Sequence, residues 1–231
     1  MRSKKPAKWA TCSAHHHARL SKGQCFKKIH KRPSTNHKLI YICLPITIGT
    51  NQITFMSFKR INNITGWIVC IIACAVYIMT MEATGSLWDC GEFASSAYKL
   101  QIPHPPGAPL FVLIGRLFMV PFDAAHAATG INLMSALASG FTILFLFWSI
   151  THFARKLVTK DGAELTNEKI YGLMAAGIVG ALAYTFSDSF WYSAVEGEVY
   201  ALSSFFTAVV FWGILKWEQS VDAEQKEGIK G

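Results

Sequence analysis

The stretch from Trp88 to Pro109, W-D-C-G-E-F-A-S-S-A-Y-K-L-Q-I-P-H-P-P-G-A-P, places charges and four prolines between two long apolar segments. It is too polar to cross a membrane, which needs about 20 mainly apolar residues. If residues 89–100 are helical, Asp89 and Glu92 lie on one face and can point at one substrate. The prolines then fix an extended segment that holds His104. We interpret this stretch as a rigid loop with a functional site; the alternative is a helix with acids at its N-terminus, followed by a proline break.

The composition indicates a membrane protein. Of the 231 residues, 52% are hydrophobic and 16% are charged, which is more apolar than an ordinary soluble domain. The net charge of +8 is uneven, because thirteen Lys or Arg and no acid precede Glu82, whereas nine Lys or Arg and fourteen acids occur from Glu82 onward. A basic tail can bind nucleic acid or anionic lipid. Before a first apolar span it is more simply a cytoplasmic topology signal, so no nucleic-acid partner is predicted.

The basic tail, residues 1–55, lacks apolar periodicity and is expected to be disordered. Its Cys and His residues do not have the spacing of a zinc site, so no metal ligands are assigned in it. No cofactor is predicted for the protein, with dependence on a divalent metal left open. Met56 precedes a short basic segment and an apolar run, and we expect translation to start there. A peptide from residues 1–55 in the mass spectrum of the native protein would refute this start.

Four apolar segments are predicted to span the membrane. They are residues 64–81, 131–150, 170–186 and 200–215. The third segment has a stripe of small residues that would let a neighbouring helix approach closely. The stripe consists of Gly172, Ala176 and Gly180. Residues 108–122 are shorter, and Arg116 would cost about 2.5–3.5 kcal/mol at the centre of a span, so an interfacial helix is predicted there.

This arrangement makes residues 56–218 the transmembrane domain and residues 219–231 a cytoplasmic end. Twenty Lys or Arg then lie in cytoplasmic segments and only Lys99 and Arg116 outside, as the positive-inside rule requires. We therefore expect a cytoplasmic N-terminus and an extracytoplasmic acidic loop. Cys90, in that loop, is expected to react with an impermeant thiol reagent.

The turn at residues 187–199, S-D-S-F-W-Y-S-A-V-E-G-E-V, is predicted on the same side as the first acidic loop. It adds Asp188, Glu196 and Glu198 to the acids there. Carboxylates gathered at a membrane surface without counter-charges favour a substrate or ion site, although they can also be solvated loop residues. Trp191 fits an interfacial aromatic belt and could also stack on a sugar ring.

Three motifs together resemble the N-terminal region of the protein O-mannosyltransferase-like membrane proteins, a bacterial family with a vertebrate relative that O-mannosylates receptor ectodomains. The motifs are W-D-C-G-E-F-A-S-S-A-Y-K-L (88–100), H-P-P-G-A-P-L-F (104–111) and S-F-W-Y-S-A-V-E-G-E-V-Y-A-L (189–202). The chain is more distantly similar to GT-C glycosyltransferases. This resemblance implies an all-α membrane fold with GT-C-like N-terminal transmembrane helices, an extracytoplasmic acidic loop and interfacial helices.

The resemblance also implies the activity: transfer of a sugar from a polyprenyl-phosphate donor to a hydroxyl of a protein or glycan, outside a bacterial inner membrane. Asp89 matches the general base, and Glu92 its partner acid, although two residues separate a pair that is adjacent in classical O-mannosyltransferases. Substrate binding is assigned to His104, Arg116, Trp191, Glu196 and Glu198. Since family members continue past the fourth span, this chain is expected to be an N-terminal fragment that is inactive alone.

Two other functional classes stay open. A non-catalytic membrane scaffold would keep the small-residue stripe and not depend on Asp89. A transporter would use the same acids for ion coupling, but the four short spans lack the broken helices or paired repeats of that class. The chain has no phosphate-binding Gly-rich loop, H-E-x-x-H or G-x-S-x-G motif, so nucleotide-driven, zinc-protease and serine-hydrolase chemistry have no motif support.

Overall fold

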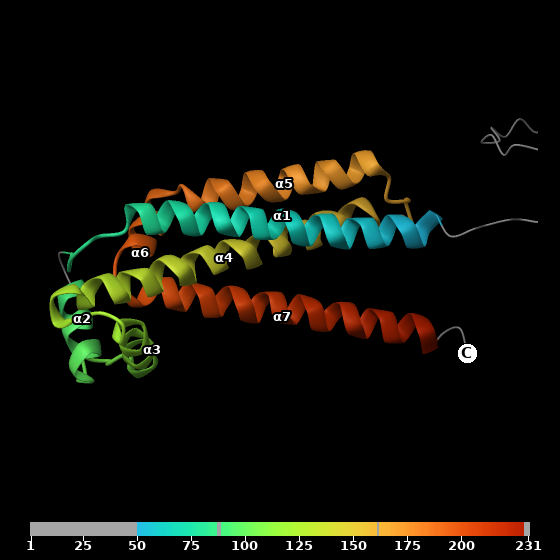
Figure 1. Cartoon of the computed structure of the whole chain (residues 1–231). Helices are drawn as coiled ribbons and strands as arrows, with labels where there is room; N and C mark the ends of the chain where they lie inside the picture. The colour runs from blue at the N-terminus through green and yellow to red at the C-terminus, as the bar shows by residue number, and fades with distance from the viewer. Residues whose placement is uncertain (1–49, 87–88, 161, 229–231) are drawn as a thin grey trace, which may run out of the picture. The chain divides into compact units, whose positions relative to one another are not determined.

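The computed structural model describes residues 50–86, 89–160 and 162–228, which belong to one compact unit. Seven α-helices and one short 3-10 helix form this part of the chain, which contains no strand, so the predicted all-α class is confirmed. The helices are α1 (Thr50–Thr80), α2 (Cys90–Lys99), α3 (Pro109–Met119), η1 (Ala124–His126), α4 (Ala127–Val158), α5 (Asn167–Thr185), α6 (Asp188–Val195) and α7 (Val199–Gly228). Figure 1 shows α1, α4, α5 and α7 running lengthwise, with α2, α3 and α6 gathered at one end.

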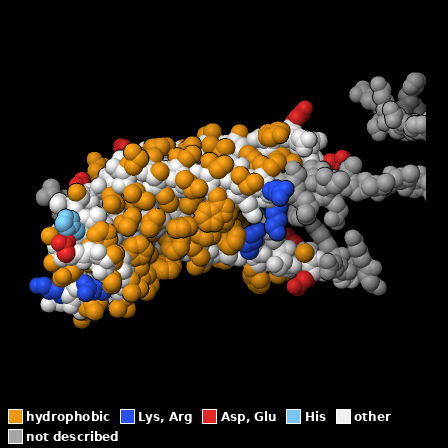
Figure 2. All heavy atoms as spheres, in the orientation of Figure 1, with side chains coloured by type: hydrophobic (Ala, Val, Ile, Leu, Met, Phe, Trp, Pro, Cys, Tyr) orange, Lys and Arg blue, Asp and Glu red, His pale blue; other side chains and the backbone are white. Residues whose placement is uncertain are grey.

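The long helix α4 is the centre of the bundle, because it contacts every other helix of the described chain. In the apolar stretch that could cross a membrane, 61% of α4 is buried inside the bundle, compared with 28% of the corresponding stretch of α1 and 17% of that of α7. The outer faces of α1 and α7 expose Ile64, Ile68, Ile71, Val210, Phe211 and Ile214. Apolar side chains also cover the middle of the molecule in Figure 2, with charged groups toward its ends. A surface of this kind fits a lipid environment or further helices.

Three helices, α1, α4 and α7, contain segments that are long and apolar enough to cross a membrane. The fifth helix, α5, qualifies only together with α6, from which it is bent by 67°. The four predicted spans thus fall in α1, α4, α5 and α7. The structure supports a membrane protein with three such helices, or four if the bent pair is one span.

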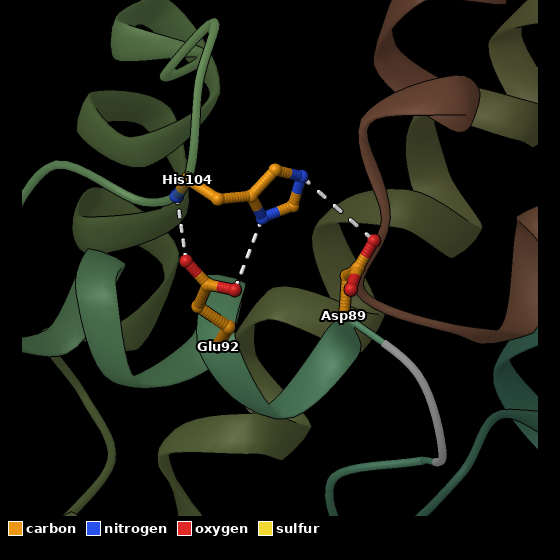
Figure 3. Close-up of side chains that lie close together, drawn as sticks. All are labelled: Asp89, Glu92 and His104. Atoms are coloured by element: carbon orange, nitrogen blue, oxygen red, sulfur yellow. Dashed lines mark hydrogen bonds and ion pairs between the residues drawn. The ribbon is translucent and has the colours of Figure 1, made fainter.

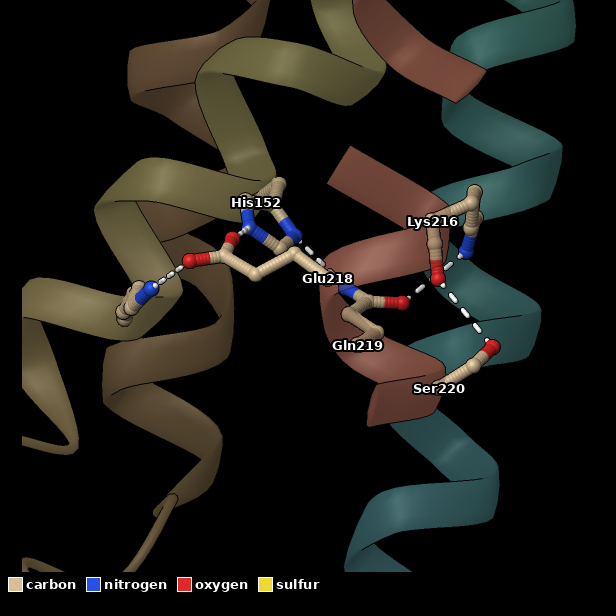
Figure 4. A network of polar contacts seen from close by, with 6 residues as sticks. His152, Lys216, Glu218, Gln219 and Ser220 are labelled. Carbon is tan, nitrogen blue, oxygen red and sulfur yellow. Dashed lines mark hydrogen bonds and ion pairs between the residues drawn. The ribbon is translucent and has the colours of Figure 1, made fainter. Parts of the chain in front are cut away.

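Several helices extend beyond their predicted ends. Of the predicted tail, residues 1–49 lie outside the described residues, whereas Thr50 already begins α1. At the same end of the bundle, α4 continues to Val158 and α7 to Gly228. Polar contacts join these extensions, since Lys156 Nζ lies 2.5 Å from Glu218 Oε1 and Gln219 Nε2 lies 2.6 Å from His152 Nδ1. Figure 4 shows this polar network between the two helices.

The stripe of Gly172, Ala176 and Gly180 was predicted to let a neighbouring helix approach closely, and within the described chain a neighbour approaches it only at Gly180. Gly172 and Ala176 are exposed, and a Cβ at Gly172 would meet nothing within 4 Å. The close approach occurs at Gly177, where a Cβ would lie 2.7 Å from Phe147 Cε2 of α4. Of the three residues in the predicted stripe, only Gly180 lies close to a neighbouring helix, where a Cβ would meet the Ile150 side chain.

A helix is present where an interfacial helix was predicted: α3 is an 11-residue apolar helix, shorter than the predicted segment of residues 108–122. Its buried side chains, among them Phe111 and Met119, contact α2 and α4. The opposite side exposes Leu110, Leu113 and Leu117. An apolar outer face of this kind suits a helix that lies along a membrane surface.

Candidate active site

The first turn of α2 carries the two predicted acids. Asp89 is the N-cap residue and makes no side-chain capping hydrogen bond, so its carboxylate is not used by the helix. Glu92 follows within the first turn. At the other end, Leu100 takes the left-handed conformation (φ 52°) and the Gln101 N–H donates to Ser96 O at 2.8 Å. These contacts end the helix and turn the chain back toward α3.

The returning loop brings His104 to both acids, as Figure 3 shows. The His104 backbone N–H donates to Glu92 Oε1 at 2.6 Å, and its ring Nδ1 lies 3.0 Å from Glu92 Oε2. The ring Nε2 lies 3.9 Å from Asp89 Oδ2, which is an ionic contact but too long for a hydrogen bond. The Phe93 ring lies beside the imidazole, with ring centroids 5.8 Å apart and the planes tilted. Glu92 therefore fixes His104, and Asp89 keeps its oxygens available.

The charges of this group reinforce one another. The hydrogen bond and charge of Glu92, and to a lesser extent the charge of Asp89, raise the pKa of His104 above its ordinary value of 6.5. The hydrogen bonds from the His104 ring and backbone lower the pKa of Glu92 below 4.5. The ion pair thus stabilises the loop at pH values between the lowered pKa of Glu92 and the raised pKa of His104. This stabilisation is lost as the pH rises through the pKa of His104.

Titration of His104 tests this assignment. In the chain labelled with ¹⁵N-histidine, the NMR midpoint of His104 is expected above 6.5. Glu92→Gln should move the midpoint down toward 6.5, because it removes the larger source of negative charge, while Asp89→Asn should move it less. A midpoint that is the same in the native chain and in Glu92→Gln contradicts the ion pair.

A second polar cluster forms around Cys90, the residue that follows Asp89 in the chain. The Cys90 thiol donates toward Glu196 Oε2 at 3.6 Å and Glu198 Oε1 at 3.5 Å. The Ser86 hydroxyl donates to Glu196 Oε1 at 2.9 Å. The predicted outer acids Glu196 and Glu198 are therefore brought to α2, but through Cys90, a residue that the sequence did not connect with them.

The prediction that Cys90 reacts readily with a thiol reagent is not supported by its surroundings. Its side chain is 2% exposed. Burial and the charges of Glu198 and Glu196 raise the pKa of the thiol to about 12. Since the thiolate is the reactive form, both effects slow alkylation.

Alkylation at pH 7.5 should therefore modify Cys90 at least about tenfold more slowly than a thiol introduced by Ser95→Cys. Ser95 lies on the exposed side of the same helix, so the comparison holds the helix constant and changes the burial of the thiol. Peptide mass spectrometry distinguishes the two thiols. Equal rates would show that Cys90 is accessible and not held by the two carboxylates.

Asn132 of α4 joins the segments that carry both clusters. Its Nδ2 donates to Glu82 O at 2.8 Å and to Thr84 O at 3.2 Å, which fixes the loop after α1. A Cβ at Gly197 would lie 2.9 Å from Asn132 Oδ1, so the turn between Glu196 and Glu198 needs a glycine to approach α4. Sequence reasoning missed Asn132, although a buried amide in an apolar span is a recognisable signal.

The remaining predicted residues lie outside the two clusters among the described side chains. The Arg116 guanidinium lies over the Tyr98 ring, 4.9 Å from its centroid. Trp191 contacts Tyr77 edge-on at 5.8 Å. Asp188 is exposed at the start of α6. Arg116 and Trp191 therefore pack against aromatic rings and do not join either acidic cluster.

The arrangement of Asp89, Glu92 and His104 permits two kinds of chemistry. Their ligand atoms all lie within 4.8 Å of one another, and two carboxylates with one imidazole suit several divalent cations. A protonated imidazole can equally supply the positive charge between the carboxylates, as the ionic contacts here do. In both cases Asp89 is a solvent-exposed carboxylate beside a fixed cationic group.

Comparison with known proteins places this chain in a family. The family model described as the protein O-mannosyl-transferase TMEM260 N-terminal domain matches residues 89–230. The chain belongs to this family. The match to the TMEM260 N-terminal domain begins at Asp89 and contains Glu92, His104, Glu196 and Glu198, so it includes both clusters apart from Ser86.

Two relatives of the TMEM260 N-terminal domain family extend this result. The chain is 25% identical over 155 residues to the protein O-mannosyl-transferase TMEM260 of Mus musculus, covering 67% of the chain and 20% of the mouse protein. It is 26% identical over 167 residues to the protein O-mannosyl-transferase tmem260 of Dictyostelium discoideum, covering 67% of the chain and 18% of that protein. The chain thus spans about a fifth of the length of these relatives. No solved structure matches it.

Proposed function

We propose that this chain contributes the acidic site of a membrane O-mannosyltransferase of the GT-C type. The enzyme transfers mannose from a polyprenyl-phosphate donor to a hydroxyl group of a protein. The names of the mouse and Dictyostelium relatives support the reaction, and the apolar helices support a substrate held at a membrane. The activity is proposed for a protein as long as these relatives, with the chain inactive alone.

Asp89 is the general base in this proposal. Its carboxylate takes the proton of the acceptor hydroxyl while the hydroxyl oxygen forms a bond to the anomeric carbon of mannose. The bond between that carbon and the phosphate oxygen breaks, and the polyprenyl phosphate leaves with the electron pair. The observation that carries this role is the availability of Asp89, which makes no cap and lies 3.9 Å from His104, beyond hydrogen-bond distance.

Glu92 and His104 position the donor. Glu92 fixes His104 through the backbone and the ring, and its charge favours the protonated imidazole. The Nε2–H of that imidazole then faces the side of Asp89, where it can donate to a phosphate oxygen of the donor. A cation at this place stabilises the negative charge of the leaving phosphate.

The end of the bundle that carries α2 and α3 is proposed to be extracytoplasmic, with the N-terminus in the cytoplasm. The Lys and Arg residues support this orientation, since those of the segments between and after the spans lie mainly at the opposite end. In the bacterial inner membrane expected from the sequence resemblance, the site would face the periplasm.

The choice of donor tests the proposal directly. The full-length protein is incubated with a Ser/Thr-containing acceptor peptide and radiolabelled mannose, linked either to polyprenyl phosphate or to a nucleotide. Label is expected on the peptide only from the lipid-linked donor, and a matched peptide with Ala in place of Ser and Thr should stay unlabelled. Transfer from the nucleotide donor alone would reject the proposed donor class.

A further inference from the structure

Cys90, Glu196 and Glu198 bring three metal-binding side chains together in a partly buried place. Cys90 is buried and both glutamates are half-buried. The Cys90 sulfur and one oxygen of each glutamate all lie within 4.8 Å of one another. Cys90 begins α2, whereas the glutamates lie in the turn between α6 and α7. The fold, and not a local sequence pattern, therefore assembles this group.

The two glutamates lack the positive partner that the first acidic cluster has in His104. In the described part of the chain, no Lys, Arg or His side chain forms an ion pair with Glu196 or Glu198. Their side-chain donors are the neutral hydroxyl of Ser86 and the thiol of Cys90. Two carboxylates in a half-buried place repel each other, and a cation between them removes this cost.

The position of the Cys90 sulfur suits a shared metal ion. A thiol has a single proton and cannot satisfy both carboxylates at once, yet Sγ lies 3.6 Å from Glu196 Oε2 and 3.5 Å from Glu198 Oε1. In a tetrahedral zinc site, with a Zn–S bond of about 2.3 Å and Zn–O bonds of about 2.0–2.2 Å, sulfur and oxygen lie roughly 3.5–3.7 Å apart. Cys90 thus already has the separation from both oxygens that a zinc ion requires.

A further contact orients one of the carboxylates. The Ser86 hydroxyl donates to Glu196 Oε1 at 2.9 Å, which leaves Oε2 directed at Cys90. Carboxylates that bind metals are commonly held through such an outer hydrogen bond. The turn itself is fixed, because Gly197 packs so closely on α4 that a Cβ there would lie 2.6 Å from Ile131 Cγ2.

We propose that Cys90, Glu196 and Glu198 form a zinc site that joins the start of α2 to the turn between α6 and α7. Zinc forms bonds to Cys90 Sγ and to one oxygen of each glutamate, and a water molecule takes the fourth position. The thiol proton is released to the solvent as the Zn–S bond forms. The ion adds two positive charges and the thiolate one negative charge, so the cluster becomes less negative.

The ligand set decides the class of metal. Magnesium and calcium prefer oxygen ligands alone, whereas a thiolate beside carboxylates favours zinc. The proposed site uses neither Asp89 nor His104 and does not depend on the proposed transferase activity. Its test measures metal binding alone.

Cobalt(II) substitution tests this site, because a cobalt–thiolate bond gives a charge-transfer band in the near ultraviolet that carboxylate and imidazole ligands do not give. The purified chain in detergent is titrated with Co²⁺ and then with Zn²⁺. The native chain should show the band, and equimolar Zn²⁺ should remove it. Cys90→Ser should not show the band.

Competition with a chromophoric chelator measures the zinc affinity. Ser86→Ala should lower it about tenfold, since an outer partner of a ligand contributes about 10–100-fold. Cys90→Ser and the double variant Glu196→Gln/Glu198→Gln each remove direct ligands and should lose at least about 100-fold. If Cys90→Ser does not fold, the double variant decides, because Gln keeps the size of Glu and an acceptor for the thiol. Native-like zinc affinity in the double variant would overturn the proposal.

Two matched controls exclude other sources of the signal. Glu164→Gln/Glu168→Gln removes the same charge from exposed positions before and in the first turn of α5 and should bind zinc like the native chain. Cys25→Ser removes a thiol outside the described residues and should keep the band. Equal losses in the two glutamate variants would show a general charge effect, and loss of the band in Cys25→Ser alone would place the metal on the tail. Both results would overturn the site.

A final arm separates the two acidic clusters. Glu92→Gln removes a carboxylate from the first cluster and should leave both the cobalt band and the zinc affinity unchanged. Loss of zinc binding in Glu92→Gln, with Cys90→Ser like the native chain, would move the metal to Asp89, Glu92 and His104. Displacement of Co²⁺ by an excess of Mg²⁺ would overturn ligation by the thiolate.

Discussion

Asp89→Asn in the full-length protein is expected to lower mannosyl transfer by at least 100-fold, while the variant still inserts, folds and binds the lipid-linked donor. Asn has nearly the same size as Asp but cannot accept the proton of the acceptor hydroxyl. A positioned general base typically contributes about 10²–10⁴-fold to the rate. The structure adds that Asp89 makes no cap and no hydrogen bond to His104, so the substitution should disturb little besides the charge. Initial rates with the polyprenyl-phosphate donor and a peptide acceptor measure the effect.

Two further variants show whether the loss is specific to Asp89. Asp188→Asn removes the same charge from an exposed position at the start of α6 and should leave the rate near that of the native protein. Glu92→Gln should cost less than Asp89→Asn, because Gln still accepts a hydrogen bond from the His104 backbone. Native-like transfer by Asp89→Asn would remove the general-base assignment, and native-like transfer by all three variants would favour the scaffold alternative.

The second large effect is expected in the packing of α5. Gly177→Val should destabilise the chain by about 1–3 kcal/mol, because its side chain would enter space held by Phe147 and Thr151, both almost fully buried. Thermal unfolding of the purified chain in detergent should show this as a loss of about 3 °C or more in Tm.

Gly172→Val is the matched control, since it places the same side chain on the same helix where a Cβ meets nothing within 4 Å. Its Tm should stay close to that of the native chain, because substitutions in such surroundings usually change stability by about 0.5 kcal/mol or less. A larger loss for Gly172→Val than for Gly177→Val would restore the small-residue stripe predicted from the sequence.

The contrast between these two glycines shows what the sequence could predict about the fold. Apolar length and composition were enough for the helical class and for the positions of α1, α4, α5 and α7. A four-residue spacing of small residues identifies a face of a helix but not whether a neighbour covers it. Gly177 is one residue from Ala176 and therefore about 100° around the helix axis, so the choice of face depends on the rotation of α5 against α4.

The same limit applies to the site. The three-residue spacing of Asp89 and Glu92 and the prolines around His104 predicted a local arrangement, and the structure brings these three side chains together. The contacts of Cys90 with Glu196 and Glu198 join residues more than 100 positions apart. They require the loop after α1 and the turn after α6 to meet on α4, which no local pattern encodes. Arg116 had a predicted role in substrate binding, but its stacking on Tyr98 depends on how α3 packs against α2.

The length of α4 has a consequence for how the protein meets a bilayer. Its 32 residues extend about 48 Å, whereas the hydrocarbon core of a bilayer is about 30 Å thick. Either the helix tilts strongly or roughly one third of it stands in the head-group layers and the water beyond them. Because Asn132 holds the loop after α1 near one tip and His152 contacts α7 near the other, membrane thickness sets how deeply each tip is immersed. In a thinner bilayer both ends of α4 would extend farther into the water. The thickness of the host membrane would therefore change how much of the site is surrounded by water.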